Sequence, residues 1–361
     1  MRIFAAKKSM NGCTMGMIHI ILVAASMSYH VFMRPDRAYI KMVRYGVQAL
    51  FLLLTVHIGY RFFAFLQHFT TPGNPFVERP HAVDAFLPIA GFMSFKYALF
   101  TGIVEPFHPA GLVMFTAIVA VSVLVKKGFC GWICPVGTLS QYVWMAGERI
   151  FGRNFRMERF TDGSFRSLKY ILMAFFLLFI GFAMAPNMML LFFISDYYMI
   201  ADVKTMLFFT NISTLSLWVI GVIGILSLLY KNVWCRYLCP YGALLGLLSR
   251  WSPARIERTE QACTHCGACS RNCPSLIDVE KQEAIRSAEC FGCLTCVASC
   301  PAPGALDVTI TSGRRRSILH PALFPVVLLG IFYLIIGAAM MLGIWRSQIP
   351  YEEYVRVLSG M

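Results

Sequence analysis

Charged residues are scarce in this chain of 361 residues. They make up 14% of it, against about a quarter in an ordinary soluble domain, whereas hydrophobic residues make up 58%. A soluble fold of this length would leave too much apolar surface in water, so the composition indicates an integral membrane protein. Acidic residues are scarcer than basic ones, with 18 Asp and Glu against 32 Lys and Arg.

Several functional signatures are missing as well. The chain has no Gly-rich phosphate loop, no Rossmann fingerprint and no Ser-His-Asp arrangement, which argues against nucleotide chemistry. The formal net charge of +14 does not require a nucleic-acid partner. A positive-inside bias of membrane loops explains it more simply, and the lipid bilayer is the expected partner.

Five apolar stretches are long enough to cross a bilayer, which takes about 20 residues in a helix. They cover residues 46–67, 108–126, 168–186, 207–230 and 321–344. A sixth stretch, 11–33, is interrupted by polar residues and is left open as a span, an interfacial helix or an extension. The segment 83–105 contains Asp84, Pro88 and Lys96, so we expect an interfacial or re-entrant helix there rather than a true span.

Basic residues gather in alternate connections between these stretches. Lys126 and Lys127 follow the second stretch and Arg314 to Arg316 precede the fifth, whereas the connections near 70–107 and 187–206 are poor in basic residues. By the positive-inside rule, the basic connections face the cytoplasm of a bacterial inner membrane. The C-terminus then lies outside.

Cysteines are frequent and regularly placed. Twelve of the thirteen fall into four short motifs, a regularity that indicates metal rather than disulfides, and Cys13 stands alone. Residues 263–274 and 290–301 each read Cys-x2-Cys-x2-Cys-x3-Cys-Pro, the bacterial two-cluster ferredoxin pattern, in which the fourth cysteine ligates the other cluster. One predicted [4Fe–4S] site therefore comprises Cys263, Cys266, Cys269 and Cys300, and the second comprises Cys290, Cys293, Cys296 and Cys273. A zinc site is the alternative, but four zinc ligands give no reason for this repeat.

The two other motifs share the form Cys-x3-Cys-Pro, and each follows an apolar stretch and a short basic linker. They contain Cys130 and Cys134, then Cys235 and Cys239. Residues four apart share one face of a helix, so each pair can present two thiolates together. Both preceding stretches run in the same direction, which indicates a parallel repeat that brings both pairs to the same membrane depth. The four thiols are predicted to form a third cluster, separate metal sites or redox dithiols, with simple packing as the alternative.

These four motifs in this order resemble the membrane polyferredoxins of the NapH, NosR and CcoG type. The resemblance covers roughly 45–312, and the short flanks make the compact NapH-type quinol dehydrogenase subunit the nearest plan. It implies electron transfer between menaquinone or ubiquinone and a redox partner such as a ferredoxin-like protein, a cytochrome or a reductase subunit. It does not decide whether the chain is itself an enzyme. A copper-reducing assembly factor for a respiratory enzyme is the alternative.

The expected fold is mainly α: a polytopic membrane protein with five or six transmembrane helices and a small α+β ferredoxin domain. The segments are an N-terminal extension (1–44), a transmembrane domain (45–254), the ferredoxin domain (255–312) and a final helix with an outer tail (313–361). His108, beside Glu105, is the candidate for quinone contact, because histidine near an acid can accept a proton. Weaker candidates on the outer side are His57, His68 and His81 for haem or quinone, and Asp196 and Asp202 as proton acceptors.

Overall fold

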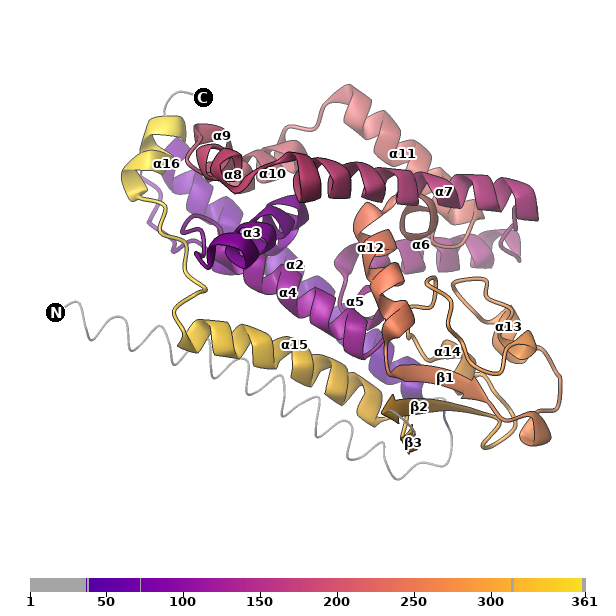
Figure 1. Ribbon diagram of the computed structural model, residues 1–361. Helices are drawn as coiled ribbons and strands as arrows, with labels where there is room; N and C mark the ends of the chain where they lie inside the picture. The colour runs from indigo at the N-terminus through magenta and orange to yellow at the C-terminus, as the bar shows by residue number, and fades with distance from the viewer. Residues whose placement is uncertain (1–36, 38, 72, 313–314, 359–361) are drawn as a thin grey trace.

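The structure is a computed structural model that describes residues 37, 39–71, 73–312 and 315–358. The apolar stretch 11–33 and Cys13 lie outside the described residues. Figure 1 shows a helical body with a small sheet and several short loops at one end, and the C-terminal helix at the opposite end. We call the end that carries the sheet the ferredoxin end, and the opposite end the outer end.

Three helices are long and apolar enough to cross a membrane. They are α2 (Tyr39–Thr70), α7 with its π-helical continuation η2 (Arg159–Phe176 and Leu177–Ala183), and α15 (Leu323–Met341). Two further predicted spans are less regular. Helix α4 (Pro109–Leu124) has only 16 residues, and α10 (Ala201–Thr210) meets α11 (Thr214–Leu229) at a bend of 75°. The prediction of five firm spans is therefore not confirmed: among the described residues three helices qualify, or four if the bent pair counts as one.

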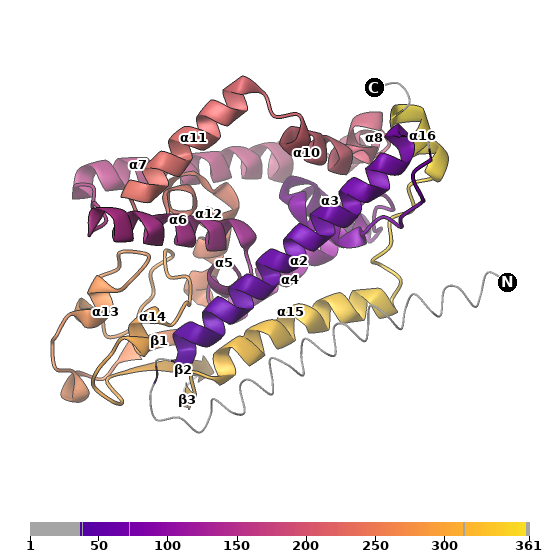
Figure 2. The same ribbon diagram turned by 180° about the vertical axis from the view of Figure 1, so that it is seen from behind.

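The long elements alternate in direction between the two ends. Helices α2, α7 and α15 run from the ferredoxin end to the outer end, whereas α4 and α11 run back (Figures 1 and 2). Helix α4 packs against α3 (Pro88–Thr101), α15 and α12 (Pro240–Leu248), and α6 (Pro135–Phe151) packs against α11. Leu215, Trp218 and Phe182 are more than two-thirds exposed on α11 and η2, as lipid-facing side chains would be.

The outer end is built from short elements. These are η1 (His81–Phe86), α3, α8 (Pro186–Phe193), α9 (Asp196–Met199), α10 and the C-terminal α16 (Tyr351–Leu358). The segment 83–105 thus contains a short 3-10 helix and a 14-residue helix instead of one span, as expected. Helix α16 packs on α2 near its C-terminal part, where Tyr354 meets the Phe65 ring edge to face.

A three-stranded antiparallel sheet holds the loops of the ferredoxin domain. Strand β2 (Leu306–Ser312) lies between β1 (Ala254–Arg258) and β3 (Arg315–Leu319), with Ile256 opposite Val308. The cysteine-rich loops carry only single-turn helices, chiefly α13 (Ala268–Arg271) and α14 (Thr295–Ala298), beside the short η4 (Ser249–Trp251), η5 (Glu260–Ala262) and η6 (Val279–Lys281). The sheet continues beyond residue 312, where the sequence placed the domain boundary, because β3 pairs with β2.

We predict that the two ends lie on opposite sides of the membrane. A reporter that is active on one side only, fused after Arg258 or after Tyr354, should give opposite signals. A fusion after Asp196 should behave like the one after Tyr354, because Asp196 pairs with Arg356 of α16. Matching signals after Arg258 and Tyr354 would contradict this arrangement.

Candidate functional site

Both Cys-x3-Cys-Pro motifs fold in the same way. The second cysteine of each pair, Cys134 or Cys239, is the N-cap of a helix whose first residue is the proline that comes next. Proline suits that position because its fixed φ is helical and its missing N–H would be unpaired there anyway. The repeat therefore places one thiol of each pair at a helix N-terminus.

The physical reason expected for the pairing is wrong, however, because neither pair lies along one face of an α-helix. Cys130 belongs to the five-residue α5 (Gly128–Trp132), which ends before Cys134. Cys235 lies in the π-helical turn η3 (Trp234–Leu238), and Cys239 follows it in an extended conformation. The chain turns between the two cysteines of each pair, and this turn brings their thiols together.

A glycine two residues after the proline completes each motif as Cys-Pro-x-Gly. A Cβ atom on Gly137 would lie 2.5 Å from the carbonyl oxygen of Cys130, so only glycine fits there. In the second repeat, the N–H of Gly242 donates to the Sγ of Cys239 at 3.2 Å. The cysteine spacing alone did not single out these glycines, although CPVG and CPYG are visible at equal positions of the repeat.

The four thiols of the two repeats are neighbours on the wall of one cavity. Burial raises the pKa of Cys134 to about 11, even though the backbone N–H of Gly137 favours its thiolate. Burial likewise raises the pKa of Cys130 and of Cys235. Half-buried thiols with raised pKa values carry charge when a metal replaces their protons, so the donor set fits a metal or a cluster better than free dithiols.

The ferredoxin cysteines gather into the two expected sets. Cys263, Cys266, Cys269 and Cys300 line one small pocket, which Arg258 and Glu280 also border. Cys273 lies beside Cys290 and Cys293, away from the other three cysteines of its own motif, and Cys296 joins them. Burial, with these neighbouring thiols, raises the pKa of Cys273 to about 12. The fourth cysteine of each motif therefore crosses to the other set.

The two ferredoxin motifs have the same backbone conformation around their sites. The third and fifth residues of each run have positive φ: His265 and Gly267 in the first motif, Gly292 and Leu294 in the second. Left-handed residues at these positions turn the chain sharply enough for successive cysteines to face one point. Shared backbone strain in both runs indicates a common requirement for the groups that they hold.

The spacing of the donors decides which type of metal site they fit. Among the residues that the structure describes, no three His, Cys, Asp or Glu side chains converge closely enough to hold a single ion. The four thiols of the Cys263 set instead surround a space, which fits a [4Fe–4S] cluster, because each iron takes its own thiolate. The four cysteines around the pocket at Cys263 are the plainest case.

The first Cys-x3-Cys loop packs directly on the second ferredoxin motif. A Cβ atom on Gly131 would lie 2.8 Å from the carbonyl oxygen of Phe291 and 3.5 Å from the Cβ of Cys293. The indole N–H of Trp132 donates to the carbonyl oxygen of Gly292 at 2.9 Å. The loop that carries Cys130 and Cys134 is thus in direct contact with the loop that carries Cys290 and Cys293.

Buried polar groups hold this contact from both sides. Arg44 of α2 donates to the carbonyl oxygen of Gly131 and to the hydroxyl of Thr295, both at 3.0 Å. From α7, the ammonium of Lys169 lies 2.7 Å from both carboxylate oxygens of Glu289. Burial opposes ionisation of Glu289, but Lys127 and Lys169 nevertheless hold the pKa of its carboxyl below the usual value. The ferredoxin domain is therefore fixed to the helices rather than tethered.

The cavity beside the four membrane cysteines has a volume of about 1570 Å³. Its walls are mostly apolar, with Leu54, Ile118, Phe332 and Ile336 among them. Its lining on α2 runs from Phe51 to Arg61, which at a rise of 1.5 Å per residue is about 15 Å of helix. Polar side chains gather at its two ends: the thiols and Lys127 toward the ferredoxin end, and a cationic rim toward the outer end. The rim comprises His57, Arg61, Arg79, His81 and Arg346, with Glu78.

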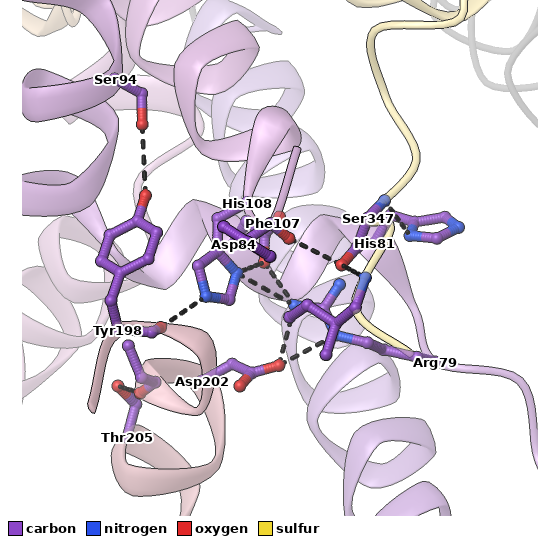
Figure 3. Close-up of polar contacts among 12 residues, drawn as sticks. Arg79, His81, Asp84, Ser94, Phe107, His108, Tyr198, Asp202, Thr205 and Ser347 are labelled. Carbon is purple, nitrogen blue, oxygen red and sulfur yellow. Dashed lines mark hydrogen bonds and ion pairs between the residues drawn. The ribbon is translucent and has the colours of Figure 1, made fainter. Parts of the chain in front are cut away.

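His108 lies elsewhere, in a buried polar network at the outer end (Figure 3). Its Nδ1 is 3.0 Å from Asp84 and its Nε2 is 2.9 Å from the carbonyl oxygen of Tyr198. Arg79 joins Asp84 to Asp202 through contacts of 2.6 and 2.8 Å. His108 is fully buried and is absent from the cavity wall, so the structure gives it a place among these carboxylates and not beside a ligand.

The other outer-end candidates are divided between the rim and the surface. His57 and His81, unlike His108, line the cavity. His68 is engaged by Asn74 and by the hydroxyl of Tyr351. Asp202 is buried in the network, whereas Asp196 is exposed and pairs with Arg356.

Two ferredoxin-type sites, joined to a thiol-lined cavity between apolar helices, define an iron–sulfur electron-transfer protein. Family models agree with this class. One, described as a 4Fe-4S binding domain, matches residues 107–156 and again 210–259. A second, described as a 4Fe-4S dicluster domain, matches 255–301. The first model recognises each membrane repeat separately, which confirms the internal duplication.

Similar proteins specify the family. "Putative electron transport protein YccM" of Escherichia coli K12 is 39% identical over 87% of this chain and 89% of its own length. "Ferredoxin-type protein NapH" of the same organism is 24% identical over 54% of this chain and 67% of its own. "Regulatory protein NosR" of Pseudomonas aeruginosa is 26% identical over 65% of this chain and 33% of its own. The chain belongs to the membrane-bound polyferredoxin family, with only a loose likeness to NapH. No solved structure matches it.

We predict that exchanging a fourth cysteine affects the cluster of the other motif. Cys300→Ser should alter the same EPR signal as Cys266→Ser, and Cys273→Ser the same signal as Cys296→Ser, because each fourth thiol crosses over. EPR of the reduced protein, with iron and sulfide counts, measures this, and the domain should hold eight irons in two clusters. Cys13→Ser is the control. Zinc in place of iron after anaerobic purification, or a Cys300 variant that changes only the Cys290 signal, would contradict the assignment.

We also predict that Arg79→Met destabilises the outer end. The change leaves Asp84 and Asp202 without their shared cation, and breaking such a buried pair costs about 3–5 kcal/mol. The melting temperature in detergent should fall by several degrees, and adding Asp202→Asn should restore part of the loss. Lys204→Met is the matched control, because this cation is exposed and lies 4.3 Å from the centre of the Tyr197 ring rather than between buried carboxylates. Equal melting of the two single variants would refute a stabilising role for Arg79.

Proposed function

We propose that this protein passes electrons between the quinone pool and a redox partner as a membrane-integral subunit. The observation that carries the proposal is the order of the three thiol sets. The pocket at Cys263 comes first, the buried set at Cys290 next, and the four membrane cysteines last, beside the cavity. Iron–sulfur clusters bound there would supply one-electron carriers.

The Cys263 set supports the partner-facing part of this proposal. Cys266 is exposed, whereas Cys273, Cys290, Cys293 and Cys296 are buried. Electron transfer to another protein needs a carrier near the surface, and this set is the accessible one. Around it, His265 lies 3.2 Å from Glu260, which also pairs with Arg258, so charged side chains border the exposed cysteine. We propose that a ferredoxin-like protein, a cytochrome or a reductase subunit docks here.

The cavity supports the quinone-facing part. Ligand pockets for drug-sized molecules span about 300–1,000 Å³, and this cavity of about 1570 Å³ accommodates a ring with part of an isoprenoid tail. Apolar walls suit the tail, and the thiols at the ferredoxin end would place the ring beside the third redox site. Menaquinone or ubiquinone is the proposed substrate class.

The proposed orientation rests on the basic residues. Arg149, Arg153, Arg156 and Arg159 lie around the turn from α6 to α7, and Arg250 and Arg255 lie at the entry to the sheet, all toward the ferredoxin end (Figure 1). We propose that this end faces the cytoplasm of a bacterial inner membrane, whose basic loops stay inside. Reduced thiols for cluster binding are available in that compartment.

A copper-handling function is the second candidate, and one observation favours it. Besides the four thiols, the cavity wall includes Met114, Met173, Met340 and Met341. Thiolate and thioether sulfur are the ligands that Cu(I) prefers. Two measurements distinguish the functions. A copper-handling protein should compete with a chelator for Cu(I) through these four cysteines. Adding quinone to such a protein should leave its cluster EPR signals unchanged.

We predict that the four membrane cysteines act as one unit in quinone-linked electron transfer. Residues that act together show non-additive losses, so Cys130→Ser alone should slow transfer about as much as changing Cys130, Cys134, Cys235 and Cys239 together. Both ferredoxin EPR signals should persist. Rates of quinol-dependent reduction of the ferredoxin clusters measure the effect, with Cys13→Ser as the control. Native rates in both the single and the quadruple variant would make these cysteines packing residues.

A further inference from the structure

Lys127 is a buried cation whose charge acts on Glu289 from a distance but whose hydrogen-bonding capacity the protein leaves unused. It follows α4 at the ferredoxin end of the cavity, and its side chain is 1% exposed. Among the residues that the structure describes, no side chain or backbone group forms a hydrogen bond with its ammonium nitrogen. Leaving a buried ammonium without a hydrogen bond is costly, so such a group calls for an explanation.

The surroundings of the ammonium place it beside the thiols. A Cβ atom on Gly242 would lie 3.7 Å from the Nζ of Lys127 and 3.3 Å from the Sγ of Cys239. On its other side, Nζ lies 5.0 Å from the centre of the Phe291 ring, which belongs to the second ferredoxin motif. The ammonium therefore stands between the membrane cysteines and the Cys290 set, and it also lines the cavity.

The neighbouring Lys126 provides a comparison. It is equally buried, but its backbone N–H donates to Ser252 and its ammonium lies 3.5 Å from the carbonyl oxygen of Ser249. Lys126 does not line the cavity. Of two adjacent buried lysines, one is bonded to the protein and the other presents its ammonium to the cavity.

We propose that the Lys127 ammonium is the hydrogen-bond donor that holds a ring oxygen of a quinone at the thiol end of the cavity. The assignment rests on the proposed quinone function and locates the head group within it. Lys127 is then a positioning residue for the substrate: it would fix the ring next to the four thiols, with the tail along the apolar wall toward Arg61. A carbonyl oxygen would satisfy the donor that the protein leaves unpaired.

Binding of a fluorescent quinol analogue, heptyl-hydroxyquinoline N-oxide, to the purified full-length protein tests this assignment. Lys127→Met should weaken binding about tenfold or more, the size expected when a charged hydrogen bond is lost. Iron and sulfide counts, and the midpoint potentials measured without the analogue, should stay as in the native protein. The melting temperature should change little, because the loss of a buried ammonium without a hydrogen bond offsets the loss of its interaction with Glu289, which keeps Lys169 as its direct partner.

Lys126→Met is the matched control, since it removes an equally buried positive charge from the same turn but no cavity donor, and it should bind the analogue with native affinity. Native affinity in the Lys127 variant would overturn the proposal. Shifted midpoint potentials with unchanged binding would also overturn it, and would make Lys127 a counter-charge to the thiols. If the native protein binds no analogue, the quinone function itself fails. That result is distinct from a failure of Lys127 alone.

Discussion

The contact between Gly131 and Phe291 is the constraint on which the rest of the arrangement depends. The carbonyl oxygen of Phe291 occupies the space that any side chain at residue 131 would need. Because Gly131 lies between Cys130 and Cys134, this contact sets how closely the membrane thiols approach the Cys290 set. A ferredoxin domain this small has little core of its own, so docking and bound metal together would supply much of its stability. Assembly of the three thiol sets and folding of the domain are therefore coupled.

The twelve motif cysteines could be grouped from the sequence because cluster ligation imposes a fixed spacing, and the structure brings the predicted sets together. The helical course could be predicted from apolar runs, but the spans could not be counted from them. Helix α4 is short and α10 bends by 75° into α11, since tertiary packing decides where a helix ends. Nor could periodicity predict the turn within Cys-x3-Cys, where α5 and η3 replace a continuous α-helix.

Basic residues were interpreted as a topology signal, and for some of them that is only part of their role. Arg44, Lys169 and Arg236 are buried around the docked loops, where they bond to Gly131, Glu289 and Asp162. Sites built from four thiolates carry net negative charge when metal is bound, and buried cations nearby offset it. Part of the positive excess thus serves the metal sites from the inside, a role that loop position alone could not reveal.

The outer end and the ferredoxin end of the molecule differ in the hydrogen bonds of their buried polar groups. At the outer end, Arg79, Asp84 and His108 each have at least one partner within the protein, as expected for groups that hold short elements together, although Nη1 of Arg79 and Oδ2 of Asp84 have none among the described residues. At the ferredoxin end, the Lys127 ammonium has no hydrogen bond within the described residues, and the half-buried thiols line the cavity beside it. A protein tolerates unpaired buried polar groups where function requires them. What distinguishes the thiol end is a whole ionisable group, the Lys127 ammonium, without any hydrogen bond among the described residues, and this supports placing the proposed ligand there although the outer end holds more ionisable residues.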